Sequence, residues 1–262
     1  MEFGNIGNYY IIEPFFRELH QCFPNAIIRT TMQMTERFCQ EEVVSCVPLD
    51  MYYGWRANEL ELAQEELRIS EVIKTTGTCT KTTPYLELVK WANLIIDFSG
   101  DIWGDNADFL GPDRFEVGLI KNLIAQNLGK PTAMLAGSPG PFTRKETAPL
   151  AKKVYSQFKL VTNREPISTR LLAEQGFDIT NTIDLACPAF LFEPAKISNM
   201  IDLLHKEGIA LQRRKKPLVG FIVCGWNFEK GPFDLWPRED SDYIKFAESV
   251  ELLTEKLGAQ VC

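Results

Sequence analysis

The sequence predicts an α/β fold built around a parallel sheet. Short runs rich in β-branched and aromatic residues alternate with longer segments whose apolar residues recur every three to four positions. Several helical segments end as helices do, at Gly129 followed by Pro131 and at Gly176. The 262-residue chain is 45% hydrophobic and 24% charged, which is typical of a folded globular protein. The alternation of strand-like and helix-like segments is typical of βαβ units, in which the strands run parallel.

The elements follow one another in a regular order. The strand segments are short and apolar, and they comprise residues 26–28, 94–98, 132–135, 158–161 and 218–223, with a further signal at 180–183. The helical segments have amphipathic spacing, and they comprise residues 9–22, 58–74, 85–91, 115–127, 145–157, 165–175, 197–207 and 243–256. Residues 259–262 are interpreted as the first residues of another strand.

A basic run at residues 213–216 precedes Pro217 and a strongly apolar strand, and it predicts a domain boundary. We therefore expect one domain over residues 1–212 and a second over residues 213–262. Because a single βα unit cannot close a core, we expect the chain to stop inside its second domain, or this unit to add strands to the first sheet. Solvated charge before a strand explains the basic run better than nucleic-acid binding or nuclear targeting.

Charge and cysteine content exclude several classes of protein. Lys and Arg number 28 against 35 Asp and Glu, and this net charge of −7 argues against a partner such as nucleic acid or an anionic membrane. The seven cysteines are odd in number and form no C-x-x-C pair, so neither a disulfide framework nor a metal site is expected. The sequence shows neither a signal-peptide pattern nor a long apolar run, and we expect a cytoplasmic protein without a transmembrane segment.

The first candidate binding residues lie in a Gly-rich turn at residues 4–8, before the first helix. Asn5, Gly7 and Asn8 are placed where free N–H groups and the positive end of a helix favour an anion. An ordinary glycine-containing turn is the alternative explanation of this segment alone.

Acidic residues follow the strand at 94–98, where ligands bind in open parallel sheets. Gly100 permits a tight turn there, and Asp101 or Asp105 is suited to accept a proton from a hydroxyl group or to hold a sugar. A purely structural turn is an equally good explanation, since Asp, Asn and Gly are the usual turn formers.

The next two strands also end in candidate residues. Ser138 and the backbone of Gly140 can approach a ligand closely. Arg164 can bind a carboxylate or phosphate through two parallel hydrogen bonds, and Ser168 stands near the start of the following helix. The alternative for Arg164 is an ion pair with Glu165 or another surface acid.

Other titratable residues carry weaker hypotheses. Asp184 is expected to orient a neighbour or to cap a turn. Cys187 is a poor candidate for a nucleophile because only His20 and His205 could activate it, and both lie in segments predicted to be helical. We interpret both histidines as packing or surface residues.

The order of these pieces is more specific than any one of them. The segments Gly4-Asn5-Ile6-Gly7-Asn8, Asp97-Phe98-Ser99-Gly100-Asp101, Ser138-Pro139-Gly140-Pro141-Phe142, Arg164-Glu165-x-x-Ser168 and Asp184 before Pro188-Ala189-Phe190 occur in sequence. Together they resemble the polysaccharide pyruvyl transferase family, over most of residues 3–190. The resemblance implies two Rossmann-like domains in a GT-B-like architecture, the second incomplete here. It also implies transfer of the enolpyruvyl group of phosphoenolpyruvate to a sugar of a cell-surface polysaccharide or its precursor, forming a pyruvate ketal.

The chemistry of that reaction gives the candidate residues their expected roles. Arg164 would be one of the cations that bind the phosphate and carboxylate of the donor, together with the helix N-termini after Gly7 and at Ser168. Asp101 or Asp105 would act as the base or hold the acceptor, and the general acid stays unassigned. The resemblance implies no cofactor beyond phosphoenolpyruvate as donor substrate, a saccharide acceptor, and a possible peripheral contact with a lipid-linked acceptor.

Three departures from the family pattern bear on activity. Asn8 stands where the family has an acid, and Ser99 replaces the first glycine of a Gly-Gly-Asp turn. The family's second domain carries a histidine proposed as the acid, and only the first βα unit of that domain is recognisable.

Two other functions are compatible with the sequence. A GT-B-like glycosyltransferase using nucleotide sugars is one alternative. Another is a non-catalytic binding partner with an apolar patch, formed by Trp226, Phe228, Phe233, Leu235 and Trp236.

Overall fold

The computed structural model describes residues 6–47, 58–111, 113–209, 216–221 and 241–261. By its contacts the chain divides into two compact units, Met1–Phe192 and Glu193–Cys262, which are described separately. The patch predicted around Trp226 and Trp236 lies outside the described residues, as does Asn5. The domain boundary at 212/213 stays a prediction.

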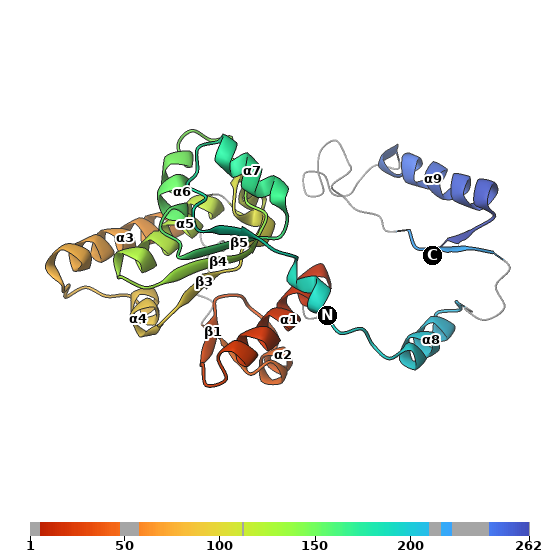
Figure 1. Cartoon of the computed structure of the whole chain (residues 1–262), viewed down its shortest axis with the longest axis horizontal. Helices are drawn as coiled ribbons and strands as arrows, with labels where there is room; N and C mark the ends of the chain where they lie inside the picture. Colours follow the sequence, from red (N-terminus) through yellow and green to blue (C-terminus); the bar gives the residue numbers. More distant parts are fainter. Residues whose placement is uncertain (1–5, 48–57, 112, 210–215, 222–240, 262) are drawn as a thin grey trace. The chain divides into compact units, whose positions relative to one another are not determined.

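The first unit is organised around a four-stranded parallel sheet in the order β3-β4-β5-β6. Its strands are β3 (Ile95–Asp97), β4 (Thr132–Gly137), β5 (Leu160–Asn163) and β6 (Thr182–Asp184). The connecting helices are α5 (Arg114–Asn127), α6 (Ala148–Tyr155) and α7 (Pro166–Glu174) (Figure 1). The parallel α/β class predicted from the sequence is therefore confirmed.

Helices α5, α6 and α7 cover one face of this sheet, as right-handed crossovers between neighbouring strands require. Met134 of β4 and Val161 of β5 pack with residues of all three helices in the largest buried cluster. The opposite face is less covered, since Leu160 and Ile183, which alternate with inward-facing residues, are 37% and 52% exposed. Two further helices, α3 (Glu59–Thr76) and α4 (Pro84–Trp91), pack with the outer side of α5.

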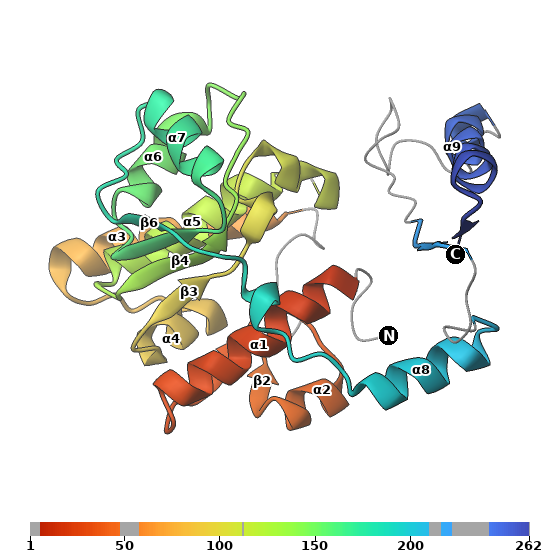
Figure 2. The same cartoon turned by 45° about the vertical axis from the view of Figure 1, so that its right-hand side comes forward.

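A second, smaller layer precedes the main sheet in the chain. It contains α1 (Ile6–Cys22), β1 (Ile28–Thr30), α2 (Glu36–Glu41) and β2 (Val44–Cys46), with β1 and β2 paired in parallel. Figure 2 shows α1, α2 and β2 side by side in this layer. Its core unites Ile12 and Phe16 of α1 with Phe38 of α2 and Val44 of β2. Helix α2 and strand β2 were not predicted, and the first predicted strand lies two residues later than expected.

The predicted turn at residues 4–8 is partly wrong. Helix α1 begins at Ile6, so Gly7 and Asn8 belong to its first turn instead of a loop before it. The physical reason is that the first turn of a helix keeps unpaired N–H groups, so a Gly/Asn-rich segment is tolerated inside it as well as before it. The helix packs against a short 3-10 helix, η4 (Pro188–Leu191), and Arg17 donates to the carbonyl of Leu191 (2.5 Å).

The second unit contains α8 (Ile197–Lys206), β7 (Leu218–Val219), α9 (Ser241–Leu257) and β8 (Gln260–Val261), with β7 and β8 paired in parallel. The predicted helices at 197–207 and 243–256 and the final strand are confirmed. The predicted strand at 218–223 extends over Leu218–Val219 within the described residues.

Candidate functional site

The candidate site lies where the strands of the main sheet end. Because β3, β4, β5 and β6 run parallel, the loops that follow them emerge at the same edge. These loops contain Gly100, Asp101, Asp105, Ser138, Gly140 and Arg164, which are six of the predicted site residues. The structure therefore brings together residues that are up to about 64 positions apart in the sequence.

Main-chain hydrogen bonds join the loop after β3 to the loop after β4. The N–H of Ser138 donates to the carbonyl of Gly100 (3.1 Å), and the N–H of Gly140 donates to the carbonyl of Trp103 (2.9 Å). In the opposite direction, the N–H of Asp105 donates to the carbonyl of Pro141 (2.9 Å). The two loops thus form one rigid frame held by backbone groups.

Glycine at position 104 is what allows the two loops to approach so closely. A Cβ at Gly104 would lie 2.6 Å from the carbonyl carbon of Gly140, a distance that real Cβ atoms do not show. Gly140 itself has a φ of +110°, which favours glycine. Strand β4 also ends irregularly, since Ala136 has a φ of +56° and the register with β5 shifts between Met134 and Gly137. These features together direct the loop that carries Ser138 toward Arg164.

Arg164 is held at the centre of this edge. Its N–H donates to the carbonyl of Gly137 (2.9 Å), and its Nε donates to the hydroxyl of Ser138 (2.9 Å). Its Nη2 lies 3.8 Å from Oδ1 of Asp101. The side chain of Arg164 is 22% exposed and that of Asp101 is 69% exposed, so the guanidinium is anchored while the carboxylate remains accessible to solvent. The ion pair that Arg164 makes is with Asp101, whereas Glu165 has another role.

Glu165 caps helix α7. Its carboxylate accepts from the N–H of Ser168 (3.0 Å) and from the Ser168 hydroxyl. Burial would raise the pKa of Glu165, but the hydrogen bonds from Ser168, from the N–H of Ile167 and from Ser138 outweigh it and lower the pKa. The N-terminus of α7 therefore already holds a carboxylate. A direct contact between Ser168 and a ligand stays a prediction.

Asp105 binds the later part of the loop between β4 and α6. Its carboxylate accepts from the N–H and hydroxyl of Thr143, and from the N–H (3.0 Å) and Nε (3.3 Å) of Arg144. Burial opposes ionisation of Asp105, but these hydrogen bonds prevail and lower its pKa. A carboxylate with several donors and a lowered pKa is a weak base, so the geometry favours Asp101 over Asp105 for an acceptor hydroxyl.

Asp184 connects the last two strands to α7. It accepts a hydrogen bond from the hydroxyl of Thr169, which also accepts from Nδ2 of Asn163 (2.8 Å). Asp184 is exposed at the end of β6, and its main chain lies opposite Asn163 in the sheet register. The carboxylate of Asp184 thus holds the hydroxyl of Thr169, and a contact between Asp184 and a ligand stays a prediction.

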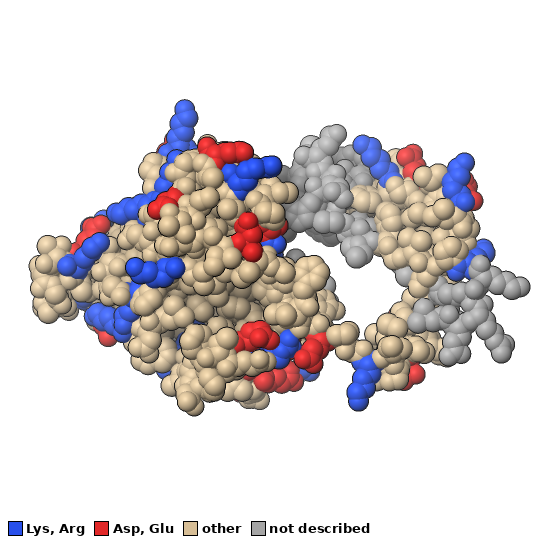
Figure 3. All heavy atoms as spheres, viewed as in Figure 1, with Lys and Arg blue, Asp and Glu red and all other residues tan. Residues whose placement is uncertain are grey.

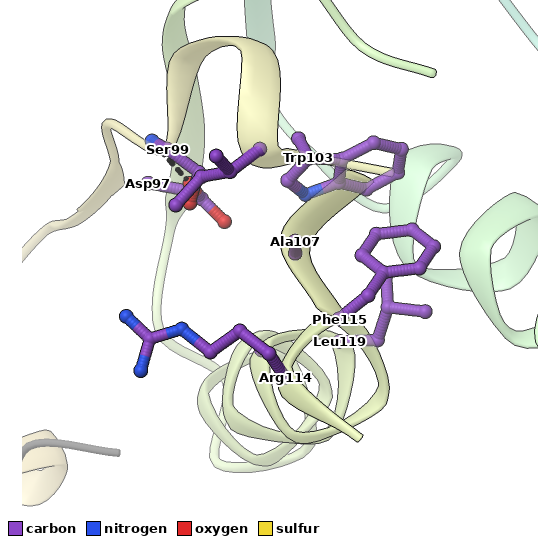
Figure 4. A pocket seen from close by; sticks show the side chains of 9 residues that line it. Asp97, Ser99, Trp103, Ala107, Arg114, Phe115 and Leu119 are labelled. Carbon is purple, nitrogen blue, oxygen red and sulfur yellow. Dashed lines mark hydrogen bonds between the residues drawn. The ribbon is translucent and has the colours of Figure 1, made fainter. Parts of the chain in front are cut away.

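Sequence reasoning did not single out Asp97, which forms the wall of a small cavity beside this edge. Its Oδ1 accepts from the N–H (2.9 Å) and hydroxyl (2.5 Å) of Ser99, and its Oδ2 accepts from Nδ2 of Asn122 (2.5 Å). The cavity measures about 30 Å³, enough for a water molecule. In Figure 4 the indole nitrogen of Trp103 faces the cavity, and this buried nitrogen has no hydrogen-bond partner among the residues that the structure describes. The Asp97-x-Ser99 spacing after a strand was the available signal, because it is typical of an Asx turn.

The remaining candidates lie away from this edge of the sheet, and His205 lies in the second unit. Gly7 and Asn8 are positioned by α1 in the smaller layer. His20 lies 2.8 Å from the carbonyl of Glu42 through its Nε2, which fits the packing role expected for it, and His205 lies in the last turn of α8. Cys187 is partly buried and precedes η4.

Nothing within the described ranges gathers three or more His, Cys, Asp or Glu side chains into a metal-binding arrangement. None of the helices in the described part of the chain is long and apolar enough to cross a membrane.

Comparison with known proteins agrees with the motif order at this edge. A family model described as polysaccharide pyruvyl transferase matches residues 5–230. The chain belongs to the polysaccharide pyruvyl transferase family. The match covers all the loops that form the candidate site and makes the chain a transferase by family. No curated protein and no solved structure matches the sequence.

Proposed function

We propose that this polysaccharide pyruvyl transferase moves the enolpyruvyl group of phosphoenolpyruvate onto a sugar of a cell-surface polysaccharide or its precursor. The observation that carries the proposal is the anchored guanidinium of Arg164, held by Ser138 and paired with an exposed Asp101 at the carboxyl edge of the sheet. Such a guanidinium suits the phosphate or carboxylate of the donor. The family match over residues 5–230 supports the reaction type.

The charge distribution requires that individual cations bind the donor locally. On the face seen in Figure 3, Lys and Arg are interspersed with Asp and Glu among the described residues, without a broad basic area on that face. The donor carries a phosphate and a carboxylate, so individual cations have to hold it. Arg164 is the cation that the loops of this edge present beside Asp101.

In this proposal Asp101 accepts the proton of the attacking sugar hydroxyl or orients that hydroxyl. The methylene carbon of the donor takes up a proton, and the hydroxyl oxygen bonds to the adjacent carbon. A second hydroxyl oxygen then closes the ketal, and phosphate leaves with the proton of that hydroxyl. Asp105 and Glu165 position the loops through the contacts described above. The GT-B-like arrangement of two domains, the saccharide acceptor and the cytoplasmic setting belong to the same proposal.

The test measures phosphate release from phosphoenolpyruvate with a panel of saccharide acceptors, together with thermal shifts on donor binding. Arg164→Lys is expected to lower kcat/KM at least about tenfold, since a hydrogen bond to a charged group contributes about 1.5–3 kcal/mol. Asp101→Asn is expected to lower kcat more than donor affinity. Arg170→Lys is the matched control, because Arg170 is exposed on α7 in an ion pair with Glu174. A thermal shift with nucleoside diphosphates but none with phosphoenolpyruvate would contradict the proposal.

A further inference from the structure

The indole N–H of Trp103 is a buried donor beside the candidate site. The side chain is 2% exposed, and its Nε1 has no hydrogen-bond partner in the described part of the chain. This nitrogen faces a cavity of about 30 Å³ that Asp97 also lines (Figure 4). A buried donor without an acceptor destabilises a fold, so an acceptor inside this cavity would stabilise it.

Asp97 offers the complementary group. A carboxylate has about four acceptor sites. Its Oδ1 accepts two hydrogen bonds from Ser99 and its Oδ2 accepts one from Asn122, so one acceptor site stays available among the described residues. Arg114, which also lines the cavity, carries only donors and cannot accept from Trp103. The cavity therefore has an N–H donor and a carboxylate acceptor in its wall.

A water molecule fits both the size and the polarity of this space. The volume is sufficient for one water molecule and too small for a phosphate ion, which has five non-hydrogen atoms. Water can accept a hydrogen bond from the Trp103 N–H and donate one to the Asp97 carboxylate at the same time. An ammonium ion has no lone pair for Trp103, and the Asp97 carboxylate would repel an anion.

We propose that a water molecule bound in this cavity links Trp103 to Asp97 and so holds the segment that carries Asp101 from both ends. Asp101 lies in a short 3-10 helix, η2 (Gly100–Ile102), between Ser99 and Trp103. On one side, Asp97 holds Ser99 through direct hydrogen bonds. On the other side, it holds Trp103 through the water. Asp97 and Trp103 are therefore positioning residues for Asp101, and they act through the loop.

The first test is NMR spectroscopy on the full, isotope-labelled 262-residue chain. The indole signal of Trp103 is assigned by its absence in Trp103→Phe. We expect a nuclear Overhauser effect between this N–H and the water resonance, with the sign that marks a long-lived bound water. Ser99→Ala removes the nearby hydroxyl proton, which could relay such an effect by exchange, and the contact should persist in this variant. The proposal is overturned if the N–H shows no contact with water or if the contact disappears in Ser99→Ala.

Hydrogen exchange tests the link to the segment around Asp101. The N–H of Ile102 donates to the carbonyl of Ser99 (3.2 Å), so its exchange rate reports on η2. Trp103→Phe should speed this exchange about fivefold, as loss of one hydrogen bond predicts. Asp97→Asn should speed it more, because the bonds to Ser99 also weaken.

The double variant decides whether Trp103 and Asp97 act through one water. Because both substitutions break the same link, the double variant should exchange more slowly than the product of the two single factors predicts. Trp91→Phe is the matched control, since Trp91 is 45% exposed on α4, and it should leave the exchange unchanged. Single factors that multiply in the double variant would overturn the link. None of these readouts depends on the donor or acceptor of the proposed reaction.

Discussion

Replacing Gly104 by alanine tests the frame that holds the candidate site. The added methyl group would lie 2.6–2.8 Å from three backbone atoms of Gly140, and backbone cannot move aside as a flexible side chain can. Separating the two loops breaks the hydrogen bonds on either side of this contact, from Gly140 to Trp103 and from Asp105 to Pro141. Two hydrogen bonds and an overpacked contact give an expected loss of about 2–4 kcal/mol in the free energy of unfolding.

The assay follows urea unfolding of Gly104→Ala by circular dichroism, with hydrogen exchange at the amides of Gly140 and Asp105. Gly118→Ala is the matched control, since a Cβ at this helical position would meet no described atom within 4 Å beyond its chain neighbours and the backbone of its own helix. Alanine in a helix interior should raise stability by about 0.5–1 kcal/mol. Replacement of glycine by alanine is thus expected to lower the free energy of unfolding at position 104 and to raise it at position 118. An unchanged unfolding midpoint in Gly104→Ala, with both amides still protected, would refute the reasoning.

Three further predictions concern buried charge, backbone strain and pH. Glu66→Ala leaves the ammonium of Lys121 buried over the ring of Tyr85 without its carboxylate, so urea unfolding should show a loss of about 3 kcal/mol, and an added Lys121→Met should recover part of it. Ala136 has a left-handed backbone conformation, which is strained for alanine but not for glycine, so Ala136→Gly should raise the melting temperature slightly. A fall in the melting temperature would contradict the inference that this residue is strained. The lowered pKa of Asp105 means that its stabilisation is present above its unfolded pKa and is lost as pH falls through the folded value. The difference in stability between wild type and Asp105→Asn, followed by urea unfolding, should therefore shrink on acidification below about pH 4.

The parallel sheet and its helices could be predicted because each has a strong local signal. The run at 132–135 is apolar after Thr132 and corresponds to β4, whose residues are almost all buried. Helix α2 escaped prediction because it has only six residues, although Thr35 accepts a hydrogen bond from the N–H of Phe38 and is a recognisable cap. Strand β2, next to it, is three residues long, which is too short to show alternation.

The candidate site could be predicted in part. Chain order placed Asp101, Ser138 and Arg164 at strand ends, and a parallel sheet brings such ends together. The partners of individual side chains could not be foreseen, because they depend on the path of each loop. Asp105 bonds Thr143 and Arg144, which follow it by 38 and 39 positions, and no local pattern links these residues.

The backbone frame around the candidate site bears on how this transferase can acquire new specificity. Its geometry rests on carbonyl and N–H groups, which every residue except proline supplies in full, and on the glycines at 104 and 140. Substitutions at Asp101 and Ser138 are therefore expected to change the side-chain contacts of Arg164 while leaving the path of the loops intact. Libraries restricted to these two positions should yield folded variants far more often than libraries that include Gly104.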